Sequence, residues 1–309
     1  MTINKREELF NNVTLKIIDA LKQGVKPWQK AWTTEGCGGF PQNALTGRSY
    51  SGINVFLLWL EAYYHDYRCN RWLTFKQAIE AGGKVKKGEK STLVVMCKPF
   101  KAAKLSDEGE PIIDMEGNEV LEDKLYTTGF HVFNIDQCEN LPESITKIPE
   151  HKLIDEVSRN NLIEQFIEAT QINIKHKYQS KAYYRPSTDN IMMPLANQFN
   201  SINDYYATLF HEMTHATGHK NRLNREGIVN TNSSIDKQCY AFEELVAEIG
   251  AAFLCAEFGI EGDMQHESYI ASWLQILEVD NHAIFRASRL AREAFELLIA
   301  DQQSEQKVA

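Results

Sequence analysis

The chain has 309 residues, of which 43% are hydrophobic, and a formal net charge of −9. No apolar run approaches the ~20 residues needed to cross a bilayer, so we expect a soluble, cytoplasmic protein without a membrane partner. The six cysteines form no CxxC pair, which argues against a zinc ribbon and against a dense disulfide framework.

Charge is unevenly distributed along the chain. Residues 1–100 carry 15 Lys and Arg against 8 Asp and Glu, whereas residues 101–309 carry 18 against 34. A basic first part followed by an acidic remainder predicts that the first part meets a polyanion. The length favours two domains, and the stretch 139–152 has two prolines and little periodicity. We therefore expect domains at 1–140 and 153–309, joined by a linker.

The first part is expected to be α+β. Apolar residues at helical spacing predict helices over 4–23, 53–64 and 74–81, the last with Thr74 as its N-cap. β-branched residues predict paired strands at 91–100 and 125–135. The acidic, turn-rich insertion between them, 105–123, is either a hairpin excursion or a mobile loop, and its role stays open.

The second part is expected to be mainly helical with a small sheet. Helical patterns cover 153–170, 203–218, 238–258 and 266–300, with a break near 280–281. Short strand-like segments follow one another at 172–178, 181–185 and 190–194. The stretch 183–194 has the character of an edge strand, which could pair with an extended peptide substrate.

The helix expected at 203–218 contains the sequence HEMTH. His211 and His215 are four residues apart and share one helix face, so both imidazoles can reach a single zinc ion. Glu212 lies beside that face, where a carboxylate can take a proton from water at the metal. Taken alone, the pattern also fits two core histidines capped by backbone carbonyls.

A third ligand is expected on the helix at 238–258. Glu243, Glu244 and Glu248 lie there among apolar residues, and a buried carboxylate is costly unless it is paired or bound to a cation. We assign Glu244 to the metal and Glu248 to orienting a ligand histidine. Glu243 would be an outward residue or a salt-bridge partner. The pattern resembles the gluzincin arrangement, whereas a metzincin would need a histidine where the chain has Asn221.

Aromatic and basic residues alternate in the first part, a composition that suits single-stranded DNA because rings stack on bases and cations neutralise phosphates. The alternative is that the rings belong to the core and the lysines to a solvated loop. The candidate DNA-binding residues are Lys26, Trp28, Lys30, Trp32, Arg48, Tyr50, Arg71, Trp72, Lys84, Lys86, Lys87 and Lys90.

Six long motifs occur in order: WQKAW, TGRSYSGINVFLL, WLTFKQAIEAGGKVKKGEKSTLVV, HVFNIDQCENL, HEMTHATGHKNRLNR and YAFEELVAEIGAAFL. Through them nearly the whole chain resembles the ArdC family of plasmid-borne antirestriction proteins. The resemblance implies a single-stranded-DNA-binding domain, a zincin-like metallopeptidase domain, and protection of incoming conjugative DNA from host restriction. It also implies one Zn2+ per chain, other divalent metals being acceptable, with His211, His215 and Glu244 as ligands and Glu212 as base.

Three functions stay open at this point. The leading hypothesis is an antirestriction protein that binds single-stranded DNA and cleaves a protein or peptide substrate. Its rival is a non-catalytic DNA-binding protein whose metal site is structural. The third is a regulatory metalloprotease that cuts a repressor.

Overall fold

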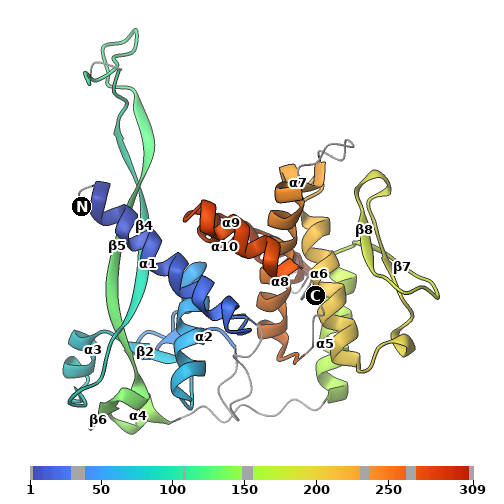
Figure 1. Ribbon diagram of the computed structural model, residues 1–309, viewed down its shortest axis with the longest axis horizontal. Helices are drawn as coiled ribbons and strands as arrows, with labels where there is room; N and C mark the ends of the chain where they lie inside the picture. Colours follow the sequence, from blue (N-terminus) through green and yellow to red (C-terminus); the bar gives the residue numbers. More distant parts are fainter. Residues whose placement is uncertain are drawn as a thin grey trace.

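The structure is a computed structural model that describes residues 3–28, 39–106, 109–147, 156–229, 237–261 and 269–305. Its first part is α+β, as expected (Figure 1). The elements of this part are α1 (Ile3–Lys22), β1 (Gln42–Asn43), α2 (Ile53–His65), β2 (Arg71–Leu73), α3 (Phe75–Glu80), β3 (Lys84–Val85), β4 (Thr92–Ala103), β5 (Leu121–Asn134), β6 (Cys138–Glu139) and α4 (Glu143–Thr146).

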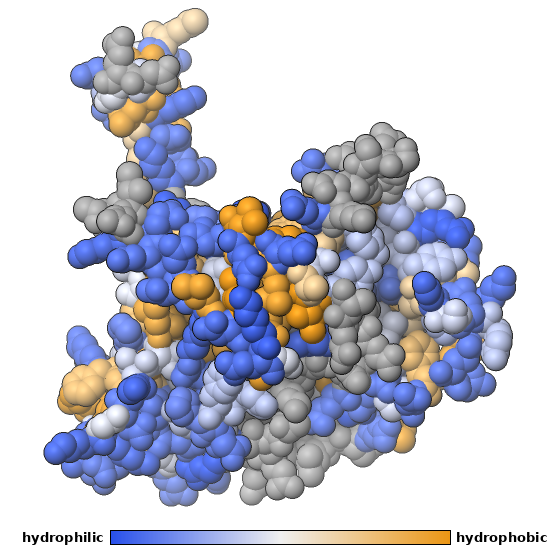
Figure 2. All heavy atoms as spheres, in the orientation of Figure 1, coloured by the Kyte–Doolittle hydropathy of each residue, from blue (hydrophilic) through white to orange (hydrophobic). Residues whose placement is uncertain are grey.

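A long antiparallel hairpin of β4 and β5 projects away from the helices (Figure 1). Beyond the paired strands, isolated bridges join Leu105 to Pro111 and Ile113 to Glu119. Of the two alternatives for the acidic insertion, its described residues therefore form a hairpin excursion. Figure 2 shows apolar atoms among hydrophilic ones at this projecting end, where Leu105, Ile113 and Met115 are exposed.

Local sequence explains where α3 begins and ends. The Thr74 hydroxyl accepts from the Gln77 backbone N–H, and the Gln77 side chain accepts from the Thr74 N–H, which forms a capping box. Gly82 follows the helix with a φ of 85°, a conformation that glycine adopts without steric cost. The predicted N-cap is thus confirmed.

The first residues of the expected linker belong to the fold. β6 pairs with β3, and Ile145 of α4 is only 5% exposed, in a cluster with Leu73 and Ile135. The apolar side chain of Ile145 therefore packs this stretch against the first part of the chain. Residues 148–155 lie outside the described part of the chain.

The second part contains helices around a three-stranded sheet, as expected. Its elements are α5 (Glu156–Ala169), β7 (Asn173–His176), β8 (Tyr183–Arg185), β9 (Asn190–Met193), α6 (Ile202–Thr217), α7 (Glu226–Val229), α8 (Lys237–Phe258), α9 (Ile270–Val279) and α10 (Ala283–Glu305). No helix among the described residues is both long and apolar enough to span a membrane.

The sheet has the order β7-β9-β8, with β9 parallel to β7 and antiparallel to β8. The expectation of an edge strand over 183–194 therefore holds for β8 but is wrong for β9, which is central. Ile191 and Met193 of β9 are fully buried, which is the reason that it occupies the middle of the sheet.

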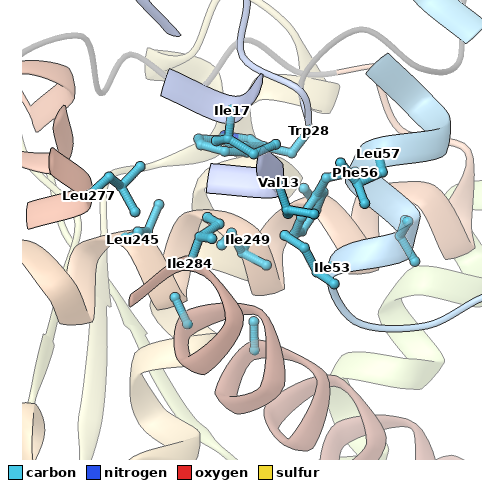
Figure 3. Packing of buried hydrophobic residues seen from close by; sticks show 14 of the residues in the cluster. Val13, Ile17, Trp28, Ile53, Phe56, Leu57, Leu245, Ile249, Leu277 and Ile284 are labelled. Atoms are coloured by element: carbon cyan, nitrogen blue, oxygen red, sulfur yellow. The ribbon is translucent and has the colours of Figure 1, made fainter. Parts of the chain in front are cut away.

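The largest core cluster joins the two ends of the chain. Helices α1 and α2 contribute to it together with α8, α9 and α10 (Figure 3). The expected break near 280–281 separates α9 from α10, and it docks onto α1: the Thr14 hydroxyl donates to the Asn281 carbonyl at 2.7 Å. The rings of Phe10 and Phe285 meet edge to face with centroids 4.6 Å apart. First and last helices therefore share one core.

Candidate metal centre

Helix α6 carries the two histidines through the centre of the second part. Its N-cap is Ser201, whose hydroxyl accepts from the Asp204 backbone N–H at 3.1 Å. From Tyr205 almost to its end the helix is buried, between the small sheet and α8. His211 and His215 are accordingly 3% and 8% exposed.

Helix α8 approaches α6 closely because of Gly250. A Cβ atom at this glycine would lie 2.5 Å from Cγ2 of Thr214, which is shorter than real contacts allow. Thr214 is itself held, because its hydroxyl donates to the Phe210 carbonyl at 2.8 Å. The glycine thus lets the glutamates of α8 come within reach of the histidines of α6.

The side chains of His211, His215 and Glu244 converge on one point. The two Nε2 atoms are 3.1 Å apart, and the Glu244 carboxylate oxygens lie 3.4 Å from His211 Nε2 and 3.5 Å from His215 Nε2. Ligands about 2.0–2.1 Å from a tetrahedral ion are separated by about 3.3 Å. Two neutral nitrogens and a carboxylate at these spacings fit a divalent transition metal with a fourth position left for water.

In the metal-free site, His215 holds a proton that a metal ion would have to displace. Burial lowers the pKa of His215, but its contacts with Glu243 and Glu244 outweigh burial and raise this pKa to about 10. Burial raises the pKa of Glu244, but His211 and His215 together hold it well below its usual value. The site is therefore a negative carboxylate beside a protonated imidazole, so that metal binding must displace a proton.

Arg225 and Glu243 support His215 from behind. The Glu243 carboxylate lies 3.3 Å from His215 Nδ1, and Arg225 Nη2 donates to the same carboxylate at 2.7 Å. Arg225, 4% exposed, also donates to the carbonyl of Thr214 at 2.7 Å and to the hydroxyl of Thr217 at 2.6 Å. Of the two expectations for Glu243, the outward orientation is wrong and the salt-bridge partner is confirmed.

Glu248 lies behind the other histidine. Its side chain is fully buried, and Oε2 is 3.8 Å from His211 Nδ1, a distance longer than a hydrogen bond. Each histidine thus has a carboxylate facing its Nδ1 side, Glu243 for His215 and Glu248 for His211. With these carboxylates on the Nδ1 side, the Nε2 atoms of both rings face Glu244.

Glu212 and β8 complete the surroundings of the centre. Glu212 is 7% exposed and lies on α6 between the two histidines. Strand β8 packs near α6 and, among the described residues, pairs only with β9, which makes it an edge strand of the sheet.

Several candidate DNA-binding residues lie inside the fold, and the expectation for them is corrected. Trp28 and Trp72 are 1% and 0% exposed, so neither indole offers a face to a base, and Lys26 is 9% exposed. Arg71 donates to the backbone carbonyls of Ile145, Lys147 and Ala44, which uses its guanidinium to hold the chain together. The alternative that the rings belong to the core therefore holds for Trp28 and Trp72.

Four of the remaining candidates form a basic surface around β3 and the turn after it. Lys84, Lys86, Lys87 and Lys90 are exposed there; Lys84 pairs with Glu139 at 3.1 Å. Arg48 is exposed and Tyr50 is half-buried on a separate turn. Lys30 and Trp32 lie outside the described residues.

Fold and site together define a two-domain protein whose second part is a zincin-like domain, with two histidines of α6 and a glutamate of α8 around a potential metal site. Comparison with known proteins agrees. One family profile, the N-terminal domain of anti-restriction factor ArdC, matches residues 7–133, and a second, a zincin-like metallopeptidase, matches residues 161–290. The chain belongs to the ArdC family of antirestriction proteins, which confirms the resemblance found in the sequence.

Solved structures of the antirestriction protein ArdC from plasmid R388 are similar over nearly the whole chain. The metal-free form is 36% identical, with a TM-score of 0.77, over 96% of this chain and 98% of that one. The Mn(II)-bound form is 37% identical, with a TM-score of 0.74, over 95% and 97%. A divalent metal is therefore in keeping with the family.

Curated relatives include a longer protein. A DNA primase TraC of Escherichia coli is 35% identical over 97% of this chain, but the match spans only 28% of the primase. The uncharacterized protein y4eC of Sinorhizobium fredii is 32% identical over 97% of this chain and 94% of its own length.

Proposed function

We propose that the chain protects incoming conjugative plasmid DNA from host restriction, that it binds single-stranded DNA through its first part, and that it hydrolyses peptide bonds at a Zn2+ centre. The observation that carries the hydrolytic proposal is the convergence of His211, His215 and Glu244 beside Glu212. Two supported imidazoles and one carboxylate leave room for water and for a substrate carbonyl. The ArdC profile over 7–133 and the exposed lysines around β3 support the DNA-binding proposal.

Each residue of the centre has a distinct task in this mechanism. A divalent ion held there would polarise the scissile carbonyl and make water more acidic. Glu212 takes up the proton of the attacking water and passes it to the departing amide nitrogen. Glu243 and Glu248 keep the imidazoles oriented, and β8 aligns the substrate by backbone hydrogen bonds along its edge.

The test is Glu212→Gln, which keeps the side-chain volume and removes the base. We expect cleavage of a generic unfolded substrate such as casein to fall by about 10²–10⁴-fold, while metal binding and DNA binding are retained. Glu168→Gln, an exposed carboxylate of α5, is the matched control and should keep full activity.

The same variant decides between the two leading functions. Plasmid transfer into a restricting recipient should lose protection with Glu212→Gln. If protection survives while cleavage is lost, protection does not depend on peptidase chemistry, and DNA binding alone accounts for it.

A further inference from the structure

A residue of the first part reaches the metal centre from behind. Trp28 follows α1, and its indole N–H donates to Glu248 Oε1 at 3.3 Å. The other oxygen of the same carboxylate, Oε2, is the one that faces His211 Nδ1 at 3.8 Å. A continuous line of buried polar contacts therefore runs from Trp28 through Glu248 to His211.

The indole is held firmly in this orientation. It meets Phe56 of α2 and Trp273 of α9 edge to face, with centroids 5.9 and 5.8 Å away and planes at 72° and 68°. Figure 3 shows Trp28 in the core with Ile17 and Phe56, close to the residues that α8 contributes. A ring packed against both parts of the chain has little freedom to turn its N–H away from Glu248.

We propose that Trp28 is a positioning residue of the metal centre: its indole N–H fixes the carboxylate of Glu248, which in turn orients His211. A fully buried carboxylate needs hydrogen-bond donors, and a directional donor sets its angle as well as its charge. Carboxylates behind a ligand histidine tune both ring orientation and basicity. The first part of the chain thus helps to build the metal site of the second. This inference rests on the proposed metal site but not on peptidase activity.

Trp28→Phe tests the inference, because it keeps an aromatic ring and removes the N–H. Trp59→Phe is the matched control: its indole is equally buried in the same core, but it donates to the Gly39 backbone carbonyl at 3.1 Å. The full chain, freed of metal, is titrated with Mn(II) by calorimetry. We expect the dissociation constant to rise about 10–100-fold for Trp28→Phe and to stay within about threefold of wild type for Trp59→Phe.

Glu248→Gln and the double variant place the effect on the proposed line of contacts. If Trp28 acts through Glu248, the double variant should bind Mn(II) about as weakly as Glu248→Gln alone. Full additivity, equal weakening by Trp59→Phe, or wild-type affinity of Trp28→Phe would each overturn the inference. A wild type that binds no metal would instead overturn the proposed site itself, whereas a wild type that binds metal but cleaves nothing leaves this test intact.

A second measurement covers the case in which Trp28→Phe does not fold. In the wild-type protein, the indole N–H resonance of Trp28 should shift on titration with Zn(II), and that of Trp273 should shift much less. An unmoved Trp28 resonance at full metal occupancy would contradict the inference.

Discussion

His215 lies between two buried carboxylates, and this placement determines how the metal-free protein responds to pH. The metal-free pKa of about 10 exceeds the ordinary value of 6.5. The pairing therefore contributes stability that is fully present below about pH 6.5 and is lost as the pH rises through 10. Metal binding must displace the same proton. A rising pH should therefore lower the stability of the metal-free protein and raise the apparent affinity for the metal.

We expect the melting temperature of the metal-free protein to fall between pH 6.5 and 10, while the apparent affinity for Mn(II) rises by up to about tenfold per pH unit. Thermal unfolding in the presence of a chelator, and calorimetric titration at the same pH values, measure the two effects. His215→Asn should abolish both trends. A metal-free protein that becomes more stable from pH 6.5 to 10 would contradict the assignment of this proton.

Single residues were predictable from the sequence where spacing along one helix decides geometry. HEMTH gave the histidine pair because positions four apart share a helix face. The role of Arg225 was missed, since it lies in the loop before α7 and pairs with Glu243 of α8 across 18 positions, a relation that periodicity does not encode. The sequence did contain an indication of such a partner, because a carboxylate such as Glu243 in an apolar helix needs one.

Helices α6 and α8 owe their close approach to the absence of a side chain at one position. In most helix interiors an alanine is more favourable than glycine by about 1 kcal/mol. At Gly250 the added methyl would press against Thr214, which its hydrogen bond to Phe210 holds in place. The local preference and the packing requirement are opposed here, and the sequence alone does not say which one prevails.

Gly250→Ala should therefore destabilise the protein, by about 1–3 kcal/mol as is usual for overpacked cores. Because the helices move apart, metal affinity should also decrease. Thermal unfolding and Mn(II) titration measure the two effects. Adding Thr214→Ala removes the opposing atoms and should restore much of the stability and of the metal affinity. If Gly250→Ala alone were more stable than wild type, the helices would not meet as described.

The longer helices and the long strand pair were predicted well by periodicity and capping, including Thr74 and the break before α10. Short elements were missed, namely β1, β2, β3, β6, α4 and α7. The pairing of β1 with β2, for example, depends on a neighbour and not on its own residues. The same limit applies to the tryptophans. Trp28 and Trp72 occur among lysines and arginines, a composition that suits DNA contact, yet packing places both indoles inside.

Across the whole molecule, DNA binding should depend on the basic surface around β3. We expect affinity for a single-stranded oligonucleotide to fall with salt, with a log–log slope of about −0.7 per phosphate neutralised. Lys87→Ala with Lys90→Ala should make the slope less steep by about 1.4. Lys175→Ala with Lys177→Ala changes the net charge equally on an exposed part of the second domain and should leave the slope unchanged. Equal effects of both pairs would remove the β3 surface from the proposed DNA site.

The division into domains at 1–140 and 153–309 remains a prediction, and the shared core limits how far the parts can act alone. Helix α1 packs on α9 and α10, and Trp28 contacts Trp273. The charge distribution and a polar stretch suggested two units. Composition could not show that the apolar faces of α1, α9 and α10 pack against one another. That contact depends on residues more than 250 positions apart.

This shared core has a consequence for biosynthesis. When α1 leaves the ribosome, the helices that will cover Leu9, Val13 and Ile17 have not yet been translated. At about 5–20 residues per second, the ~250 residues between α1 and α9 take roughly 12–50 s to make. Throughout that interval the apolar face of α1 lacks these late partners, so ribosome-associated chaperones can bind it.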